Sequence, residues 1–145
     1  MYSVSGGCHC GNVQVDLELT REPATYHPRA CDCDFCRKHC AAYLSDPRGA
    51  LTIRVRDASN MGAYRQGNSL AECLVCRNCG VMVGVIYRGG DRVIGAVNVN
   101  AIAGGANFAA EQPVSPKALS GEAKIARWRE IWFPNVTIAI DDTPA

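Results

Sequence analysis

The residues best able to do chemistry in this chain are its nine cysteines, because thiolates bind metals and act as nucleophiles. They form three groups along the chain: Cys8 and Cys10, then Cys31, Cys33, Cys36 and Cys40, then Cys73, Cys76 and Cys79. In the last group, two residues separate Cys76 from Cys79 and Gly80 follows, which is the spacing of a zinc knuckle. A tight turn of this kind directs both sulfur atoms at one ion, and glycine permits the close backbone approach. The pattern predicts half of a zinc site.

A second pair, Cys8 and Cys10, supplies the other half in our interpretation. Thiols at i and i+2 of an extended chain point to the same side, and His9 between them points away. Two pairs that lie far apart in sequence can complete one tetrahedral site. We therefore expect Cys8, Cys10, Cys76 and Cys79 to bind a structural zinc ion, so that metal binding contributes to folding.

The middle group allows two interpretations. Cys31 and Cys33 would face one way and Cys36 follows after a turn, so that three thiolates converge and leave a fourth metal position open to a substrate. A substrate thiol that entered there would be held as a thiolate. In the other interpretation, Cys40 or His39 supplies the fourth ligand and closes the site. The spacing alone favours neither of them.

Three further side chains near these groups have more than one conceivable role. Arg37 and Lys38 could offset the negative charge of a three-thiolate zinc centre, or they could attract an anionic ligand. Cys73 could pair with Cys40 in a redox role, or it could simply be buried, since free cysteine packs well. The sequence leaves these alternatives open.

Composition bounds the class of protein. The chain has 145 residues, of which 48% are hydrophobic and 20% charged, and we expect one domain over residues 1–145. Its net charge of +1 shows no basic excess, so we expect no nucleic-acid partner. No apolar run reaches the ~20 residues of a membrane helix, and the first residues lack a signal-peptide pattern. We therefore expect no membrane association and a cytoplasmic location, where thiols stay reduced.

The elements that must position these cysteines are mainly β-strands. Residues 12–19 alternate between polar and apolar side chains, and residues 51–55 repeat the pattern, which is typical of half-buried strands. Residues 80–87 and 92–100 are rich in β-formers and are joined across Gly89-Gly90-Asp91, which predicts a hairpin. The four-cysteine site would therefore clip the N-terminal loop to this hairpin.

One helix is predicted near the C-terminus, over residues 121–132. Ser120 is a suitable N-cap, apolar residues that include both tryptophans recur at helical spacing, and Pro134 ends the pattern. We expect the tryptophans to pack against the sheet. Residues 103–118 contain two glycines and two prolines and are expected to form an ordered loop.

The three cysteine motifs, in this order, resemble a known family. Gly7-Cys8-His9-Cys10-Gly11, then Cys31-x-Cys33-x-x-Cys36-Arg37-Lys38, then Cys76-x-x-Cys79-Gly80 are similar to the motifs of the glutathione-dependent formaldehyde-activating enzymes. Centromere protein V shares the same domain. The motif-bearing core covers about residues 5–100, and three ordered motifs are far more specific than any one of them.

The resemblance implies a mainly β, β-tent-like zinc-binding fold of antiparallel sheets with one short C-terminal helix. It also implies two zinc ions per chain and a carbon–sulfur lyase that interconverts formaldehyde plus glutathione with S-hydroxymethylglutathione. The expected partner is therefore a small thiol or thiol adduct. By position, the ligands of the structural zinc would be Cys8, Cys10, Cys76 and Cys79, and those of the second, catalytic zinc would be Cys31, Cys33 and Cys36. The resemblance favours the open interpretation.

Some residues depart from the family pattern. Asp32 and Asp34 lie inside the central motif, and two extra carboxylates predict repulsion of an anionic substrate such as glutathione. His27 and His39 are the candidate proton donors. The alternative function is a non-catalytic zinc-stabilised module that binds another protein, and closure of the second site by Cys40 would favour it.

Overall fold

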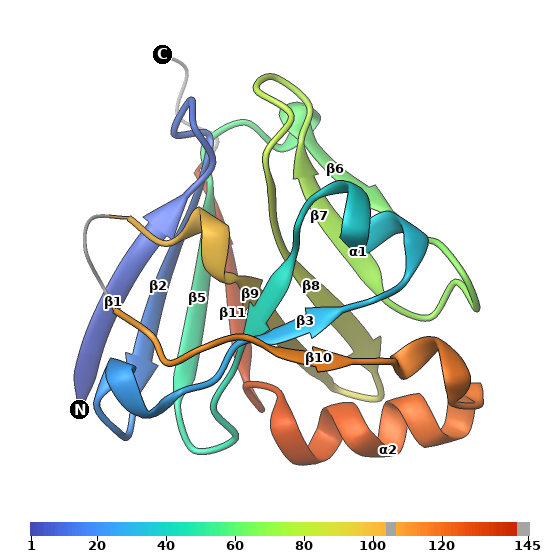
Figure 1. Ribbon diagram of the computed structural model, residues 1–145. Helices are drawn as coiled ribbons and strands as arrows, with labels where there is room; N and C mark the ends of the chain where they lie inside the picture. Colours follow the sequence, from blue (N-terminus) through green and yellow to red (C-terminus); the bar gives the residue numbers. More distant parts are fainter. Residues whose placement is uncertain (104–106, 142–145) are drawn as a thin grey trace.

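The structure, a computed structural model, describes residues 1–103 and 107–141, and its strands form two sheets (Figure 1). The four-stranded sheet has the order β1 (Tyr2–Gly7), β2 (Val13–Leu19), β5 (Ala50–Val55), β11 (Val136–Ile140). The seven-stranded sheet has the order β10 (Gln112–Val114), β3 (Arg29–Cys31), β4 (Ala42–Leu44), β9 (Arg92–Asn98), β8 (Met82–Gly89), β7 (Glu72–Cys76), β6 (Met61–Tyr64). The expected mainly β fold of largely antiparallel sheets is confirmed, although the edge strands β10 and β11 pair in parallel.

Helical segments are short. The α-helices are α1 (Asp34–Lys38) and α2 (Gly121–Ile131). Single 3₁₀ turns are η1 (Pro23–Thr25), η2 (Ala58–Asn60), η3 (Val99–Ala101) and η4 (Pro116–Ala118). None of the helices in the described ranges is long and apolar enough to cross a membrane.

The strands predicted from alternation are present. β2 and β5 pair antiparallel, with Val15 opposite Ile53 and Leu17 opposite Leu51, so their apolar side chains meet on one face. β8 and β9 form the predicted hairpin, and Gly90 adopts the left-handed φ of +67° that its turn requires. Burial of the apolar face therefore fixed the register that the sequence pattern indicated.

Helix α2 begins as predicted and ends one residue early, at Ile131. The Ser120 side chain accepts a hydrogen bond from the Ala123 amide at 3.2 Å, which satisfies one of the free amides of the first turn. Beyond the helix, the Phe133 amide donates to the Gly95 carbonyl at 2.9 Å and anchors the chain to β9. The helix therefore has a fixed position against the seven-stranded sheet.

The expectation of a loop over residues 103–118 is wrong in part. Residues 104–106 lie outside the described residues, but Gln112–Val114 form β10 and Pro116–Ala118 form η4. β10 pairs in parallel with β3, a strand far away in sequence. Its three residues carry no periodicity of their own, and only the edge of the sheet makes them a strand.

The seven-stranded sheet separates two hydrophobic clusters. One joins both sheets and contains Leu74 and Cys76 of β7. The other lies between the sheet and the helices, and it contains Cys73 of the same strand together with Trp132. Side chains alternate between the faces of a strand, so Cys73 and Cys76, three residues apart, serve different sides of the sheet.

Candidate metal centres

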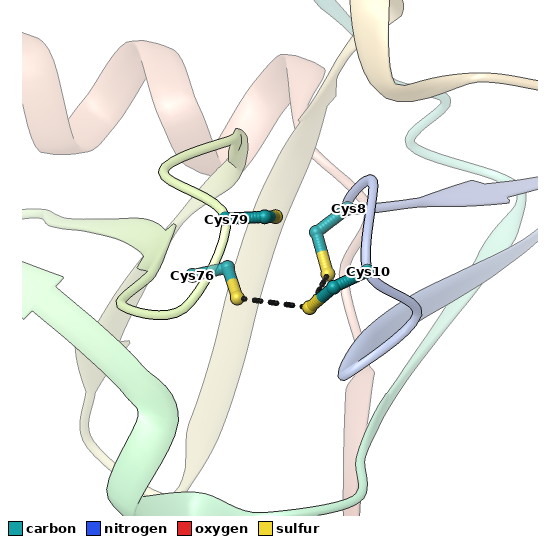
Figure 2. A group of neighbouring side chains, drawn as sticks. All are labelled: Cys8, Cys10, Cys76 and Cys79. Atoms are coloured by element: carbon teal, nitrogen blue, oxygen red, sulfur yellow. Dashed lines mark hydrogen bonds between the residues drawn. The ribbon is translucent and has the colours of Figure 1, made fainter.

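Four cysteines converge where two loops meet, one between β1 and β2 and one between β7 and β8 (Figure 2). The Sγ atoms of Cys8, Cys10, Cys76 and Cys79 all lie within 4.8 Å of one another. Cys10 Sγ is 3.7 Å from Cys8 Sγ and 3.6 Å from Cys76 Sγ. A tetrahedral zinc ion with Zn–S bonds of ~2.3 Å needs sulfur–sulfur distances of ~3.8 Å. The donor set therefore fits zinc.

The backbone around this cluster is held by its own hydrogen bonds. The Gly80 amide donates to the Cys76 carbonyl at 2.8 Å, and Gly80 has the left-handed φ of +82° that closes the turn. Cys8 and Cys10 lie in a turn, not in the extended segment that their spacing predicted. The Cys8 amide donates to the Val13 carbonyl at 2.8 Å, and this closes the loop and turns both thiols toward the second pair.

Hydrogen bonds and burial shift the pKa values of the thiols in this cluster in opposite directions. Burial would raise the pKa of Cys79, but the backbone amides of Cys10 and Val81 outweigh it and lower that pKa to about 6. The side chain of Asn78 lowers the pKa of Cys10, whereas burial raises the pKa of Cys8 to about 11. Metal binding must therefore displace protons from the buried thiols, which makes it dependent on pH.

Three cysteines converge at a second place, at the start of α1. Cys31 ends β3, Cys33 is the N-cap of α1, and Cys36 lies in the helix. The Cys36 amide donates a hydrogen bond to Cys33 Sγ at 3.4 Å. All three sulfur atoms lie within 4.8 Å of one another. In the described part of the chain, no fourth cysteine, histidine or carboxylate joins them at this distance. Three thiols with a fourth position left over also fit a zinc ion.

Tyr43 contacts this cluster, although no motif in the sequence pointed to it. Its hydroxyl lies 3.0 Å from Cys36 Sγ, and both side chains are buried. A hydrogen bond from the Cys36 thiol lowers the pKa of Cys31 to about 6 against the effect of burial, while the same contact raises the pKa of Cys36. Their contact therefore favours ionisation of Cys31 over ionisation of Cys36.

A cavity of about 250 Å³ opens beside the three cysteines, and all three line it. Tyr43 and Cys73 line the same cavity. Burial raises the pKa of Cys73 to about 12, so this thiol stays protonated at neutral pH. A small molecule in the cavity would reach the cluster directly.

The alternative in which Cys40 or His39 closes the second site does not match the structure. Cys40 is exposed and takes a left-handed φ of 50° where the chain leaves α1, and it neither joins the cluster nor lines the cavity. His39 packs against Phe35, with ring centroids 4.7 Å apart. The chain reversal after α1 carries both side chains away from the three thiols.

Neither predicted proton donor lies in the cavity wall. His27 is exposed, and its Nδ1 lies 2.9 Å from the Ala110 carbonyl oxygen. His39 packs against Phe35 and does not line the cavity either. Gln66, which sequence reasoning did not single out, lines the cavity and places its Nε2 3.8 Å from Cys33 Sγ.

The charged residues around the cavity also differ from the prediction. Arg37 and Lys38 are exposed and do not line it. Asp32 pairs with Lys117 at 3.7 Å, Asp34 is exposed, and neither aspartate lines the cavity. The positive side chains in the lining are Arg29, Lys117, Lys124 and Arg127. They come from β3, η4 and α2, so no local motif could have grouped them. The repulsion of an anionic substrate by Asp32 and Asp34 stays a prediction.

The fold and the two clusters define a class of β-rich proteins with one four-cysteine and one three-cysteine candidate metal site. The sequence model for the glutathione-dependent formaldehyde-activating enzyme matches residues 3–119, and the chain belongs to this family. The predicted resemblance is thereby confirmed. The crystal structure of a Rhodobacter sphaeroides protein is similar to this chain, with 35% identity and a TM-score of 0.51 over 70% of this chain and 89% of the other. No curated protein matches the chain significantly.

Proposed function

We propose that this protein is a zinc-dependent carbon–sulfur lyase that acts on small adducts of a thiol and an aldehyde, of the S-hydroxymethylglutathione type. The observation that carries this proposal is the three-cysteine cluster in the wall of a cavity, with no fourth protein ligand among the described residues. Catalytic zinc sites keep such a position for substrate, whereas structural sites fill all four. Family membership supports the reaction class.

The proposal assigns two zinc ions per chain. Cys8, Cys10, Cys76 and Cys79 would hold the structural ion, and Cys31, Cys33 and Cys36 the second, catalytic one. Residues 1–145 would act as one domain in the cytoplasm. The free state of all nine cysteines agrees with a reducing compartment.

In the proposed reaction, the carbon–sulfur bond of a hydroxymethyl thioether breaks. The sulfur keeps the bonding electron pair as a thiolate, the hydroxyl oxygen forms the carbonyl of the aldehyde, and its proton passes to water. A zinc ion in the second site would stabilise the thiolate form of the substrate sulfur. Cys31, Cys33 and Cys36 would hold that ion at the cavity wall, and the Tyr43 hydroxyl orients Cys36 through their 3.0 Å contact.

The test is zinc content and turnover in Cys33→Ser, with Cys40→Ser as the matched control, since Cys40 lies in the same segment but outside the cavity. We expect Cys33→Ser to lose one of two zinc ions and its aldehyde–thiol turnover, and Cys40→Ser to keep both. If Cys33→Ser loses one zinc but keeps full activity, the catalytic assignment is wrong. If the wild type binds two zinc ions and turns over no adduct, a non-catalytic protein-binding module is the better account.

A further inference from the structure

The cavity beside the three cysteines carries an excess of positive charge. Four cationic side chains line it, from β3, η4 and α2. Lys117 has a carboxylate partner in Asp32 at 3.7 Å, and Lys124 donates to the neutral amide oxygen of Asn68 at 3.2 Å. Arg29 and Arg127 make no ion pair with any carboxylate in the described residues. Two arginines in one cavity wall therefore have no carboxylate partner within the described part of the chain.

Arg29 is held rigidly in this position. Its Nη2 donates to Ser45 Oγ at 2.7 Å, and Ser45 Oγ donates in turn to the Ile131 carbonyl at 2.6 Å, at the end of α2. Arg29 and Arg127 line the same cavity, so two guanidinium charges face one space. A partly buried cation beside a like charge is unfavourable unless an anion neutralises it. The guanidinium planes suit a carboxylate, which they bind through paired hydrogen bonds.

The wall next to these arginines is apolar. The Trp128 and Trp132 rings stack with centroids 4.6 Å apart, and both line the cavity with Ile131 and Val85. Trp132 is only 6% exposed, so its ring is fixed by packing. Such a surface binds methylene or aromatic groups.

We propose that Arg29 and Arg127 form an anion subsite that binds a carboxylate of the substrate, and that the apolar body of the substrate lies along Trp128 and Trp132 toward the three cysteines. The inference rests on the proposed function, because it takes the cavity as the place where a substrate thiol binds. It specifies the substrate class as a mercaptocarboxylate with an apolar chain.

A competing explanation uses the same charges differently. Three thiolates around one divalent zinc ion leave a net charge of −1, and the arginines could simply offset it. The two explanations differ in what the arginines recognise. An offset of the cluster charge acts on every thiol alike, whereas a carboxylate subsite discriminates between probes with and without a carboxylate.

The experiment measures binding of mercaptohexanoate and of mercaptohexanol, which lacks the carboxylate, to the zinc-loaded full chain by calorimetry. We expect the wild type to prefer mercaptohexanoate by roughly tenfold or more, the effect of a hydrogen-bonded charge pair. Arg127→Gln should reduce that preference about threefold to tenfold and leave mercaptohexanol binding unchanged. Arg129→Gln is the matched control, since it removes the same charge from α2 but does not line the cavity. Arg29→Lys, which retains a charge at the buried position, should also lower the preference, with circular dichroism as the check on folding.

The outcomes separate this inference from the proposed function. Equal binding of both probes to the wild type, or an equal loss of both in Arg127→Gln, overturns the carboxylate subsite whether or not the protein has lyase activity. A carboxylate preference that depends on Arg127 but not on Arg129 supports the subsite even if no thiol–aldehyde adduct is turned over. In that case the lyase proposal fails by itself.

Discussion

The two cysteine clusters meet the same strand, β7, from opposite sides. Cys76 on one face belongs to the four-cysteine cluster, whereas Cys73 on the other lines the cavity of the three-cysteine cluster. The first cluster joins loops of both sheets, and its Cys10–Cys76 contact spans 66 positions in sequence. The second draws its three thiols from the short segment between Cys31 and Cys36.

This difference in sequence separation agrees with the different roles proposed for the two clusters. A metal that joins distant segments removes much chain entropy from the unfolded state, because loop-closure entropy grows with loop length. A metal held within six residues removes little. A metal in the four-cysteine cluster would therefore stabilise the fold, and one in the three-cysteine cluster would contribute little to stability.

The largest expected effect is a difference in unfolding free energy between variants of the two clusters. Cys76→Ser should lose the structural zinc and several kcal/mol of unfolding free energy, because structural zinc sites contribute about 10 kcal/mol or more to folding. Cys33→Ser should fold and cost about 1 kcal/mol. Thermal unfolding with metal analysis measures both. Similar losses of stability in the two variants would contradict the division of roles.

A second prediction concerns Asp46, whose carboxylate should make the stability of the fold depend on pH independently of metal release. Burial would raise the pKa of Asp46, but the hydrogen bonds from Thr20 and Tyr26 outweigh it and lower that pKa from 3.8 to about 2. Because the folded-state pKa is the lower one, this carboxylate stabilises the fold above about pH 4, and the contribution disappears as the pH falls from about 4 to about 2.

Asp46→Asn should therefore lose about 2 kcal/mol near neutral pH and show a flatter decline of stability between about pH 4 and 2. Denaturant unfolding at several pH values measures this, and zinc content at each pH identifies metal release. An unchanged acid dependence in the variant would show that Asp46 does not carry it.

A third prediction concerns the contact between Tyr43 and Cys36 in the three-cysteine cluster. Tyr43→Phe removes the hydroxyl 3.0 Å from Cys36 Sγ and should weaken zinc binding at the second site about 10- to 100-fold, with stability lower by about 1 kcal/mol. Competition with a chromophoric chelator measures the affinity. Tyr64→Phe is the control, since Tyr64 is 55% exposed and stacks on Phe35. Equal zinc affinity in both variants would remove Tyr43 from the site.

The smallest effect is expected at Cys40. Cys40→Ser should change stability by no more than about 0.5 kcal/mol and leave the zinc content unchanged, because the side chain is exposed. Loss of a zinc ion from Cys40→Ser would instead show that Cys40 is a ligand.

Much of the fold could be predicted where the pattern is local. Alternation gave β2 and β5, the Gly89-Gly90-Asp91 junction gave the β8–β9 hairpin, and Ser120 marked the start of α2. β10 could not be predicted, because its pairing with β3 depends on a sheet edge formed by distant residues.

The sequence by itself indicated the local groups of thiols, because ligand spacing within a turn is fixed by a few backbone bonds. These groups are Cys8 with Cys10, Cys76 with Cys79, and Cys31 with Cys33 and Cys36. The sequence could not decide between an open and a closed second site, since that depends on the left-handed turn that carries Cys40 away. It also could not show that Cys73 and the arginines of β3 and α2 share one cavity with Cys31, Cys33 and Cys36. Such side chains meet only when the sheet packs against α2, and burial of apolar surface, not local sequence, drives that packing.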